Sequence, residues 1–375
     1  MPRAARFSSA EQLGQLLVVG FDGTEMSPRL FDLLRRVQPA GVILFARNIA
    51  SAQQTHRLLR DCQSSVREPL LTCVDLEGGQ VDRFRKITGP APSAAEVFAS
   101  GEAGFFRKHG EIIGKSCRAL GFNVDFAPVL DLAFDASRTV MSSRSVSRDP
   151  KDVIRYAREF VAGLARAGVV GAGKHFPGLG EGTLDSHHDL PVISKSFKKL
   201  WEQDLAPYRA MKRRLPMVLI SHANYPAVTR DELPASLSKK WITDVLRRKI
   251  GYRGLIVSDD LEMGGVLKAA PIDDAAVGFI RTGGDLCLIC HQQEFVEETF
   301  ETMQRTFARD LRFRLRVEES AKRITAFKRK HAKLLKMPAA PSQEKIEKLS
   351  RQLWEFSERV RLQHLAFEAR AGAEA

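Results

Sequence analysis

The stretch that most strongly indicates the fold spans residues 168–191 and reads GVVGAGKHFPGLGEGTLDSHHDLP. It opens on a continuous apolar run, which is typical of a strand buried on both faces. Lys174 and His175 close that run, and the glycines that follow, at 178, 180 and 182, allow the backbone to turn tightly. A polar loop at the end of a buried strand is where α/β enzymes usually carry their chemistry.

Seven further short apolar runs of the same kind recur along the chain, with amphipathic helical patterns between most of them. Together with Val169–Lys174, the candidate strands are Leu16–Phe21, Gly41–Phe45, Pro69–Val74, Asn123–Ala127, Leu215–Ser221, Leu255–Ser258 and Asp285–Cys290. Apolar strands that alternate with helices indicate parallel pairing through right-handed crossovers. Eight such units predict an α/β fold with a closed (β/α)8 barrel, and an open doubly wound sheet is the alternative.

The residues that follow these runs are polar in nearly every case. They are Asp22, Arg47, Asp75, Asp131, Lys174, His222, Asp259 and His291. In a parallel barrel the carboxyl ends of all strands meet at one face. We therefore expect these side chains to converge around one pocket.

The composition is that of a globular protein, with 44% hydrophobic and 27% charged residues among 375. No apolar run approaches the roughly 18 residues that span a bilayer. The N-terminal residues meet polar Glu11, Gln12 and Gln15 before any long apolar segment, unlike a signal peptide. We expect a cytoplasmic chain with no membrane partner.

The five cysteines have no spacing that indicates a disulfide framework. Cys287, Cys290 and His291 match the C-x-x-C-H pattern of haem attachment, but the run around them is typical of a strand interior. We interpret all five as buried structural thiols.

The net charge of +13 is concentrated in residues 305–330, a segment that contains ten Lys or Arg and only three Asp or Glu. Phe307, Leu311, Leu315, Ile324 and Phe327 recur there at roughly helical spacing, which predicts a helix with one apolar stripe and a solvated basic face. Attraction to an anionic ligand or to RNA is the alternative. No nucleic-acid motif accompanies the charge, so we expect no nucleic-acid partner.

A Pro/Ala/Ser-rich break at residues 336–344 separates a catalytic barrel, residues 1–335, from a C-terminal helical extension, residues 345–375. The extension carries an amphipathic pattern, formed by Ile346, Leu349, Leu353, Trp354, Phe356, Val360 and Leu365. It is expected to pack on the barrel, with an oligomer contact as the alternative. The pattern leaves the oligomeric state open.

Two further motifs carry carboxylates at strand ends. In VSDDLEM, residues 257–263, adjacent carboxylates on a strand point in opposite directions, so at most one faces the pocket. We assign Asp259 to the site and Asp260 to a helix N-cap. In VDLEGGQVDRFR, residues 74–85, Asp75 ends a strand and Arg83 offers a planar fork of donors to a carboxylate or to sugar hydroxyls, with a surface arginine as the alternative.

These motifs make the chain recognisable. Over roughly residues 10–330 it resembles the β-N-acetylhexosaminidases of glycoside hydrolase family 3, through GVILFARNI, VDLEGGQVDRFR, FAPVLDL, GKHFPG, DSHHDLP and VSDDLEM in the family's order. The resemblance implies that Asp259 is the catalytic nucleophile, His187 the acid/base and Asp185 its carboxylate partner. It implies substrate contacts for Asp75, Arg83, Arg144, Lys174 and His175.

The chemistry agrees with these assignments. A retaining glycosidase needs a nucleophile on one face of the sugar and a proton donor at the leaving oxygen. A histidine suits the second role because its unperturbed pKa lies near 6.5. The reaction needs no cofactor and no metal ion, and the His and Asp residues lack a metal-ligand spacing.

The resemblance implies a retaining exo-β-N-acetylglucosaminidase that acts on peptidoglycan-derived muropeptides. One residue departs from the family: its loop commonly reads KHFPGHG, and Leu179 stands in place of the second histidine. This difference puts the leaving-group preference in doubt. A β-N-acetylglucosaminide phosphorylase and a non-catalytic sugar-binding protein are the alternatives. Two further hypotheses stay open. His175 is a purely structural residue in the first, and His222 is a further pocket residue in the second.

Overall fold

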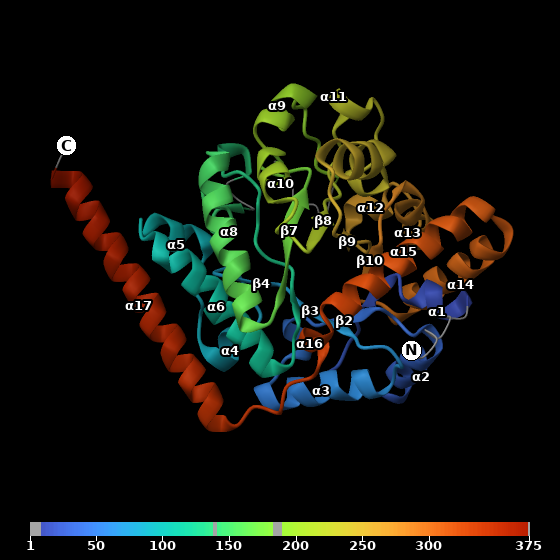
Figure 1. The fold of residues 1–375 in the computed structure, drawn as a ribbon, viewed down its shortest axis with the longest axis horizontal. Coiled ribbons are helices and arrows are strands. Elements are labelled where there is room, and N and C mark those ends of the chain that lie inside the picture. The colour runs from blue at the N-terminus through green and yellow to red at the C-terminus, as the bar shows by residue number, and fades with distance from the viewer. Residues whose placement is uncertain (1–8, 138–140, 183–189, 374–375) are drawn as a thin grey trace.

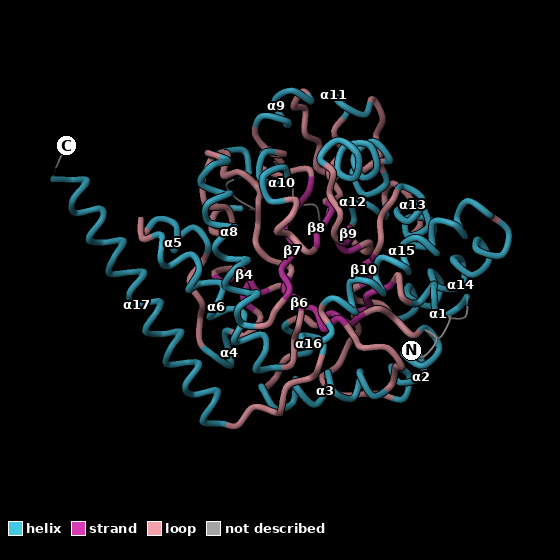
Figure 2. The backbone as a smooth tube through the Cα atoms, viewed as in Figure 1, coloured by secondary structure: helices cyan, strands magenta, loops and turns pink. Residues whose placement is uncertain are grey.

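The computed structural model describes residues 9–137, 141–182 and 190–373. Eight parallel strands close into a barrel in the order β1-β10-β9-β8-β7-β6-β3-β2. The strands form a ring near the middle of the molecule, and helices surround it (Figures 1 and 2). The predicted (β/α)8 barrel is confirmed, and the open-sheet alternative is wrong.

Each barrel strand lies at one of the eight predicted apolar runs. The strands are β1 (Leu17–Val19), β2 (Gly41–Ile43), β3 (Leu71–Val74), β6 (Val124–Asp125), β7 (Val170–Phe176), β8 (Met217–Ile220), β9 (Leu255–Asp260) and β10 (Leu286–Ile289). Most are shorter than predicted, because the apolar run continues into buried loop residues at both ends. A separate antiparallel hairpin, β4 (Leu76–Gly78) with β5 (Val81–Asp82), follows β3.

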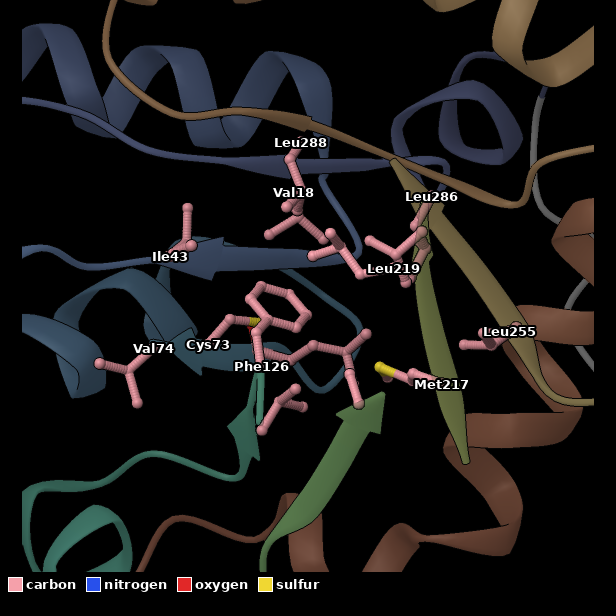
Figure 3. Packing of buried hydrophobic residues seen from close by; sticks show 14 of the residues in the cluster. Val18, Ile43, Cys73, Val74, Phe126, Met217, Leu219, Leu255, Leu286 and Leu288 are labelled. Atoms are coloured by element: carbon pink, nitrogen blue, oxygen red, sulfur yellow. The ribbon is translucent and has the colours of Figure 1, made fainter. Parts of the chain in front are cut away.

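The barrel interior is filled by side chains from neighbouring strands in register. Val18 lies opposite Leu288, and Met217 lies opposite Leu255, so the members of each pair face the same side. Figure 3 shows Val18, Phe126 and Met217 converging on the space enclosed by the strands. All of these side chains are almost fully buried. The barrel is therefore a packed core, as in other folds of this type.

The same inward rows continue toward the carboxyl ends of the strands and become polar there. Ala172 of β7 is in register with Met217, and Lys174 is the next residue of β7 on that face. Leu255 is in register with Met217 on the other side, and Asp259 lies four residues further along β9. The inward row of β7 thus continues into a charged residue, and β9, whose register against β10 shifts between Val257 and Asp260, ends on two carboxylates.

The helices lie outside the barrel. They are α1 (Ser9–Gly14), α2 (Pro28–Val37), α3 (Ala52–Ser64), α4 (Arg85–Thr88), α5 (Ala94–Ala99), α6 (Ala103–Leu120), α8 (Pro150–Ala167), α9 (Phe197–Glu202), α10 (Ala206–Met211), α11 (Pro226–Thr229), η4 (Lys240–Ile250), α12 (Gly264–Leu267), α13 (Ile272–Thr282), α14 (Gln293–Arg309), α15 (Leu311–Lys330), α16 (Ala332–Leu335) and α17 (Gln343–Ala373). Single-turn helices η1 (Ala46–Asn48), η2 (Asp135–Ser137) and η3 (Ala235–Leu237) lie in the connections.

Helix α8 illustrates how the sequence places these elements. The side chain of Asp149 caps its first turn, Pro150 occupies the first helical position, and Gly168 ends it with φ 84°. Helix α8 can pack closely on α6 because Gly110 of α6 has no side chain. A Cβ atom at that position would lie only 2.1 Å from the carbonyl oxygen of Phe160 in α8. These signals fix where β7, the strand of Lys174, begins.

The basic segment differs from its prediction. It is two helices, α14 and α15, separated at Asp310, whose side chain accepts from the backbone N–H groups of Arg312 and Phe313. Leu311 and Leu315 are 65% and 57% exposed, and Phe313 is buried in their place. The break shifts the helical register, so the predicted stripe is wrong in its first half.

The basic face of α15 is also less solvated than predicted. Asp285, fully buried just before β10, accepts hydrogen bonds from Arg323 at 3.1 Å and from Arg316 at 3.4 Å, and it pairs with Arg247 of η4. These arginines attach α15 to the barrel.

Helix α17 runs along one flank of the molecule past α4, α5 and α6, with the C-terminus at its far end (Figure 1). Ile346, Leu349, Leu353, Phe356 and Val360 are buried at spacings of three and four, so they form the face that packs. Trp354 and Leu365 of the predicted pattern are exposed instead. The division at residues 336–344 stays a prediction.

All five cysteines are free and buried, as predicted. Burial raises the pKa of the Cys287 thiol in β10, and the thiol has no route to a haem vinyl group. Among the helices in the described ranges, none is both long and apolar enough to cross a membrane.

Candidate active site

A cavity of about 340 Å³ opens at the carboxyl ends of the strands. Its charged and titratable lining residues are Asp75, Glu77, Arg83, Arg144, Lys174, His175, Asp259, Asp260 and His291. All six predicted site residues that the structure describes are in this set, and they come from four barrel strands, β3, β6, β7 and β9, or from the segments that follow them. The other two, Asp185 and His187, lie outside the described residues.

Glu77 of β4 is the centre of an ion-pair network in this cavity, and sequence reasoning missed it. Its carboxylate accepts two hydrogen bonds from Arg144, at 2.8 and 2.9 Å, and lies 2.6 Å from Lys174 Nζ. Burial alone would raise the pKa of Glu77, but the charges of Arg144 and Lys174 hold it well below its ordinary value. The available signal was the position of Glu77 next to Gly78 and Gly79.

The two glycines explain why the hairpin can bring Glu77 inward. Gly78 and Gly79 have φ of 83° and 60°, and a Cβ atom on Gly78 would lie 2.2 Å from the carbonyl oxygen of Pro92. Only glycine permits both the conformation and the approach.

Lys174 is buried between two carboxylates. Its Nζ lies 2.7 Å from Asp75 Oδ1 as well as 2.6 Å from Glu77 Oε1. Burial would lower the pKa of Lys174, but the charges of Asp75 and Glu77 raise it above its ordinary value. The ammonium group is therefore a fixed hydrogen-bond donor that holds Asp75 at the cavity wall.

His175 is oriented by a buried carboxylate, Asp131. Its Nδ1 lies 2.7 Å from Asp131 Oδ2, and its backbone N–H donates to the same oxygen at 3.1 Å. Because a carboxylate accepts, Nδ1 carries the proton, and the lone pair of Nε2 then faces Arg144 Nη2 at 3.4 Å. His175 is thus both structurally fixed and part of the cavity lining.

Asp131 also fixes the start of the loop after β7. Its Oδ1 accepts from the backbone N–H of Leu179 at 2.7 Å. Gly178 has φ 135°, and a Cβ atom on it would lie 2.6 Å from Asp204 Cβ, so glycine is required there. Glycine is needed at position 180 because the backbone there comes close to the carbonyl oxygen of Leu132; its φ is not positive. Gly182, the last described residue before the gap, lines the cavity.

Asp259 and Asp260 both line the cavity, so the prediction that only one would face it is wrong. Asp260 does not cap a helix: α12 begins at Gly264, and the Asp260 carboxylate accepts from the backbone N–H of Glu262 at 3.1 Å and pairs with His291 Nε2 at 3.2 Å. Strand β9 ends at these residues, and the chain turns there, which frees both side chains from strict alternation.

An aromatic and cationic cluster forms the wall beside Asp260. The rings of Phe45 and His291 stack with centroids 5.3 Å apart, and the Arg83 guanidinium lies 5.7 Å from the Phe45 centroid. Arg83 therefore points into the cavity and is not a surface residue. The hydrogen bond to Asp260 raises the pKa of His291 above its ordinary value.

The expected convergence of strand-end residues holds only in part. Asp75, Lys174, Asp259 and His291 line the cavity, whereas Asp22, Arg47, Asp131 and His222 do not. His222 is buried behind the wall, where its ring nitrogens contact Ser236 Oγ at 2.8 Å and the carbonyl oxygen of Asp260 at 2.9 Å. The hypothesis that His222 is a pocket residue is wrong, and its place is beneath the end of β9.

No group of three or more His, Cys, Asp or Glu side chains in the described part of the chain is arranged to hold a metal ion. The cavity instead presents neutral and charged donors and acceptors around an apolar floor that includes Phe126, Leu219 and Leu288. Such a lining suits a polar ligand with apolar edges, as a sugar is.

Residues 9–326 match the family described as glycosyl hydrolase family 3 N terminal domain. The chain belongs to glycosyl hydrolase family 3. It is therefore a glycoside hydrolase, and the cavity with Asp259 at its wall is the candidate active site of a family 3 barrel.

Two relatives are similar to this chain in sequence over most of their length. The chain is 35% identical over 305 residues to a beta-hexosaminidase of Bordetella avium, a match that covers 77% of this chain and 84% of the relative. It is 38% identical over 287 residues to a beta-hexosaminidase of Alkalilimnicola ehrlichii, covering 75% and 82%.

A solved structure shows the same fold. A glycoside hydrolase family 3 beta-N-acetylglucosaminidase from Paenibacillus sp. str. FPU-7 superposes with a TM-score of 0.86 at 31% identity, covering 94% of this chain and 69% of that chain.

Proposed function

We propose that this protein is a retaining exo-β-N-acetylglucosaminidase that releases terminal N-acetylhexosamine through a covalent glycosyl-aspartate intermediate. One observation carries the proposal: barrel closure brings Asp259 of β9 into one cavity with Asp75, Arg83, Lys174 and His175. Membership of family 3 and similarity to beta-hexosaminidases support the choice of sugar.

In the proposed cycle Asp259 attacks the anomeric carbon while His187 protonates the departing oxygen. His187 then takes a proton from water, which hydrolyses the glycosyl ester, and Asp185 holds the imidazole in the required tautomer.

The ion pairs of the cavity support the proposed substrate-binding roles. Lys174 and Asp75 hold each other and offer a fixed donor and acceptor to sugar hydroxyls, and Arg144, clamped by Glu77, points a guanidinium edge toward His175. Because these groups are already positioned before the sugar arrives, little reorganisation accompanies binding.

Charge favours hydrolysis over phosphorolysis. Four carboxylates line the cavity (Asp75, Glu77, Asp259 and Asp260) against three permanent cations (Arg83, Arg144 and Lys174). Arg144 and Lys174 are already paired with carboxylates, which leaves Arg83 as the cation without an ion pair among the described lining residues. Such a site attracts a neutral sugar and water more than a phosphate dianion.

We further propose that the natural substrates are N-acetylglucosaminyl muropeptides and that the enzyme acts in the cytoplasm. Both assignments rest on the resemblance of the motifs to cell-wall-recycling members of the family. The non-catalytic alternative is disfavoured because all six site residues within the described ranges line the cavity.

The test is to trap the enzyme with a 5-fluoro N-acetylglucosaminyl donor and to map the modified peptide by mass spectrometry. We expect one sugar attached to Asp259. A sugar on Asp260 would reassign the nucleophile, and rapid turnover without any adduct would contradict the covalent route. Release of sugar 1-phosphate in phosphate buffer would establish a phosphorylase instead.

A further inference from the structure

A second cavity, of about 650 Å³, lies at the opposite end of the barrel. It is lined by the connection that precedes β8, the connection that precedes β9, and the C-terminal part of α15, elements that are labelled in Figure 1. Leu255, the first residue of β9, lines this cavity, whereas Asp259 near the end of the same strand lines the active site. The two cavities are therefore separated by the barrel core.

The lining of this second cavity is basic and contains no carboxylate. Its cationic or titratable residues are Lys212, Arg213, Arg214, Arg253, Arg323, Lys330 and His331. They come from three segments that are far apart in sequence, so folding gathers them. A solvated basic face would spread its charges over a convex surface, but here they surround a concavity.

Some of these cations already have structural partners. Lys212 donates to the carbonyl oxygen of Ile250 at 2.8 Å, and Arg323 donates to Asp285 at 3.1 Å. Arg213, Arg214, Arg253 and Lys330, in contrast, make no side-chain hydrogen bond or ion pair within the described ranges. Their side chains are exposed, so they can turn toward an anion that enters the cavity without breaking a structural contact.

His331 contributes an aromatic ring to the lining of this cavity. Its Nε2 is buried and has no hydrogen-bond partner among the described residues, and its ring lies 4.5 Å, centroid to centroid, from that of Phe327. Burial and the charge of Lys330 lower its pKa, so the imidazole stays neutral and its ring packs as a largely apolar surface. Beside it, Leu215, Pro216 and Phe327 provide an apolar floor.

We propose that this cavity binds a small molecule that carries at least two phosphate groups and an aromatic part, of which a nucleoside diphosphate is the simplest example. Arginine forks bind phosphate oxygens in pairs, and Arg213, Arg214 and Arg253 supply three of them at the rim. The volume lies within the range of small-molecule sites, and the apolar floor with the His331 ring suits a base.

The test is calorimetric titration of the full-length protein with ADP, pyrophosphate and inorganic phosphate. We expect one ADP per chain, bound more tightly than pyrophosphate and far more tightly than phosphate, and weakened by added salt. The triple variant Arg213→Ala, Arg214→Ala, Arg253→Ala should bind ADP at least tenfold more weakly. The corresponding Arg→Lys triple should fall between the two, because it keeps charge but loses the forks.

The matched control is the triple variant Arg57→Ala, Lys115→Ala, Lys151→Ala, which removes three exposed cations that line neither cavity. It should bind ADP as the unmodified protein does. Equal weakening in both triples would reduce the effect to net charge and overturn the site. So would absence of binding at millimolar ADP and pyrophosphate, or displacement of ADP by N-acetylglucosamine. Tighter binding of a single-stranded RNA oligonucleotide than of ADP would overturn the small-molecule assignment.

Discussion

Glu77 and Arg144 form a two-pronged ion pair at 2.8 and 2.9 Å inside the active-site cavity, with side chains only 4% and 15% exposed. Glu77 holds Lys174 with the same carboxylate, so one buried residue positions two proposed sugar-binding cations. Neither cation can shift toward solvent without losing its contact with this buried carboxylate.

Replacing Glu77 with Gln should therefore harm both stability and substrate binding. Breaking one side of a buried ion pair costs roughly 3 kcal/mol or more, and KM for a chromogenic N-acetyl-β-glucosaminide should rise. The depressed pKa of Glu77 stabilises the fold above the unfolded pKa, near 4.3, and this contribution is lost as the pH falls below that value. Denaturant unfolding from pH 7 to pH 3 should thus show the difference between Glu77→Gln and the unmodified protein shrinking in acid.

The control is Glu159→Gln, which removes a partly exposed partner of Arg107. It should change stability little. A similar loss in both variants would contradict the central role of Glu77.

Asp259→Ala should lower kcat by roughly 10³-fold or more while the protein still unfolds cooperatively. The reason is that Asp259 is the carboxylate proposed to form the glycosyl ester. Turnover of a nitrophenyl N-acetyl-β-glucosaminide gives the measurement, and Asp260→Ala is the comparison. Asp260 faces the same cavity but is paired with His291, so its variant should keep measurable turnover. The reverse order of losses would exchange the roles of the two aspartates.

His187→Ala should slow substrates with poor leaving groups by roughly 10²- to 10⁴-fold and slow activated aryl glycosides much less. A proton donor matters only when the departing oxygen is basic. Rates for a series of aryl glycosides of falling phenol pKa would provide the test. A uniform loss across the series would indicate that His187 positions the substrate.

The His291–Asp260 pair predicts a measurable titration. Because the folded pKa of His291 is raised, the pair stabilises the fold fully below the unfolded pKa, near 6.5, and this contribution is lost as the pH rises through the folded value. NMR titration of the imidazole C–H signals, assigned with His291→Gln, should give a pKa above 6.5. Asp260→Asn should bring it down, and an unchanged value would show that the contact is absent in solution.

Lys328 is buried at the other end of the barrel, where its Nζ donates to Gln15 Oε1 at 2.8 Å. Burial lowers its pKa to about 7, and the charge of Glu68 offsets this only in part. The unfolded chain thus binds the extra proton between pH 7 and 10, so stability should rise with pH there by up to about 1.4 kcal/mol per pH unit. Lys328→Met should gain most at pH 7 and lose this advantage by pH 10. A pH-independent difference would mean that Lys328 keeps its ordinary pKa.

The barrel was predictable because a strand buried on both faces must be apolar throughout, and eight such runs stand out between helices. The place of the polar residues at the ends of these strands, such as Asp75 and Asp259, was also predictable, because parallel strands of one barrel all end at the same face. The apolar stripe of α15 was placed wrongly because Asp310 breaks the helix and resets its register.

The roles of Glu77 and Asp131 were not predictable in the same way. Their partners lie 67 and 44 residues away. Arg144 is in a loop whose path depends on side-chain contacts, and His175, although it is in β7, is reached by Asp131 from a different loop. Asp260 was misassigned because strict strand alternation was assumed at the last residue of β9, where the chain already turns. Catalytic roles for Asp185 and His187 stay predictions.

The hydrogen bond from the backbone N–H of Leu179 to Asp131 affects which side chains position 179 can accept. The tether uses a backbone N–H that every amino acid except proline possesses, so the side chain at that position can vary without loosening the loop's anchor. Leucine at this position can then be replaced by another side chain, which changes the cavity lining, while the imidazole of His175 keeps its orientation from the other oxygen of the same carboxylate.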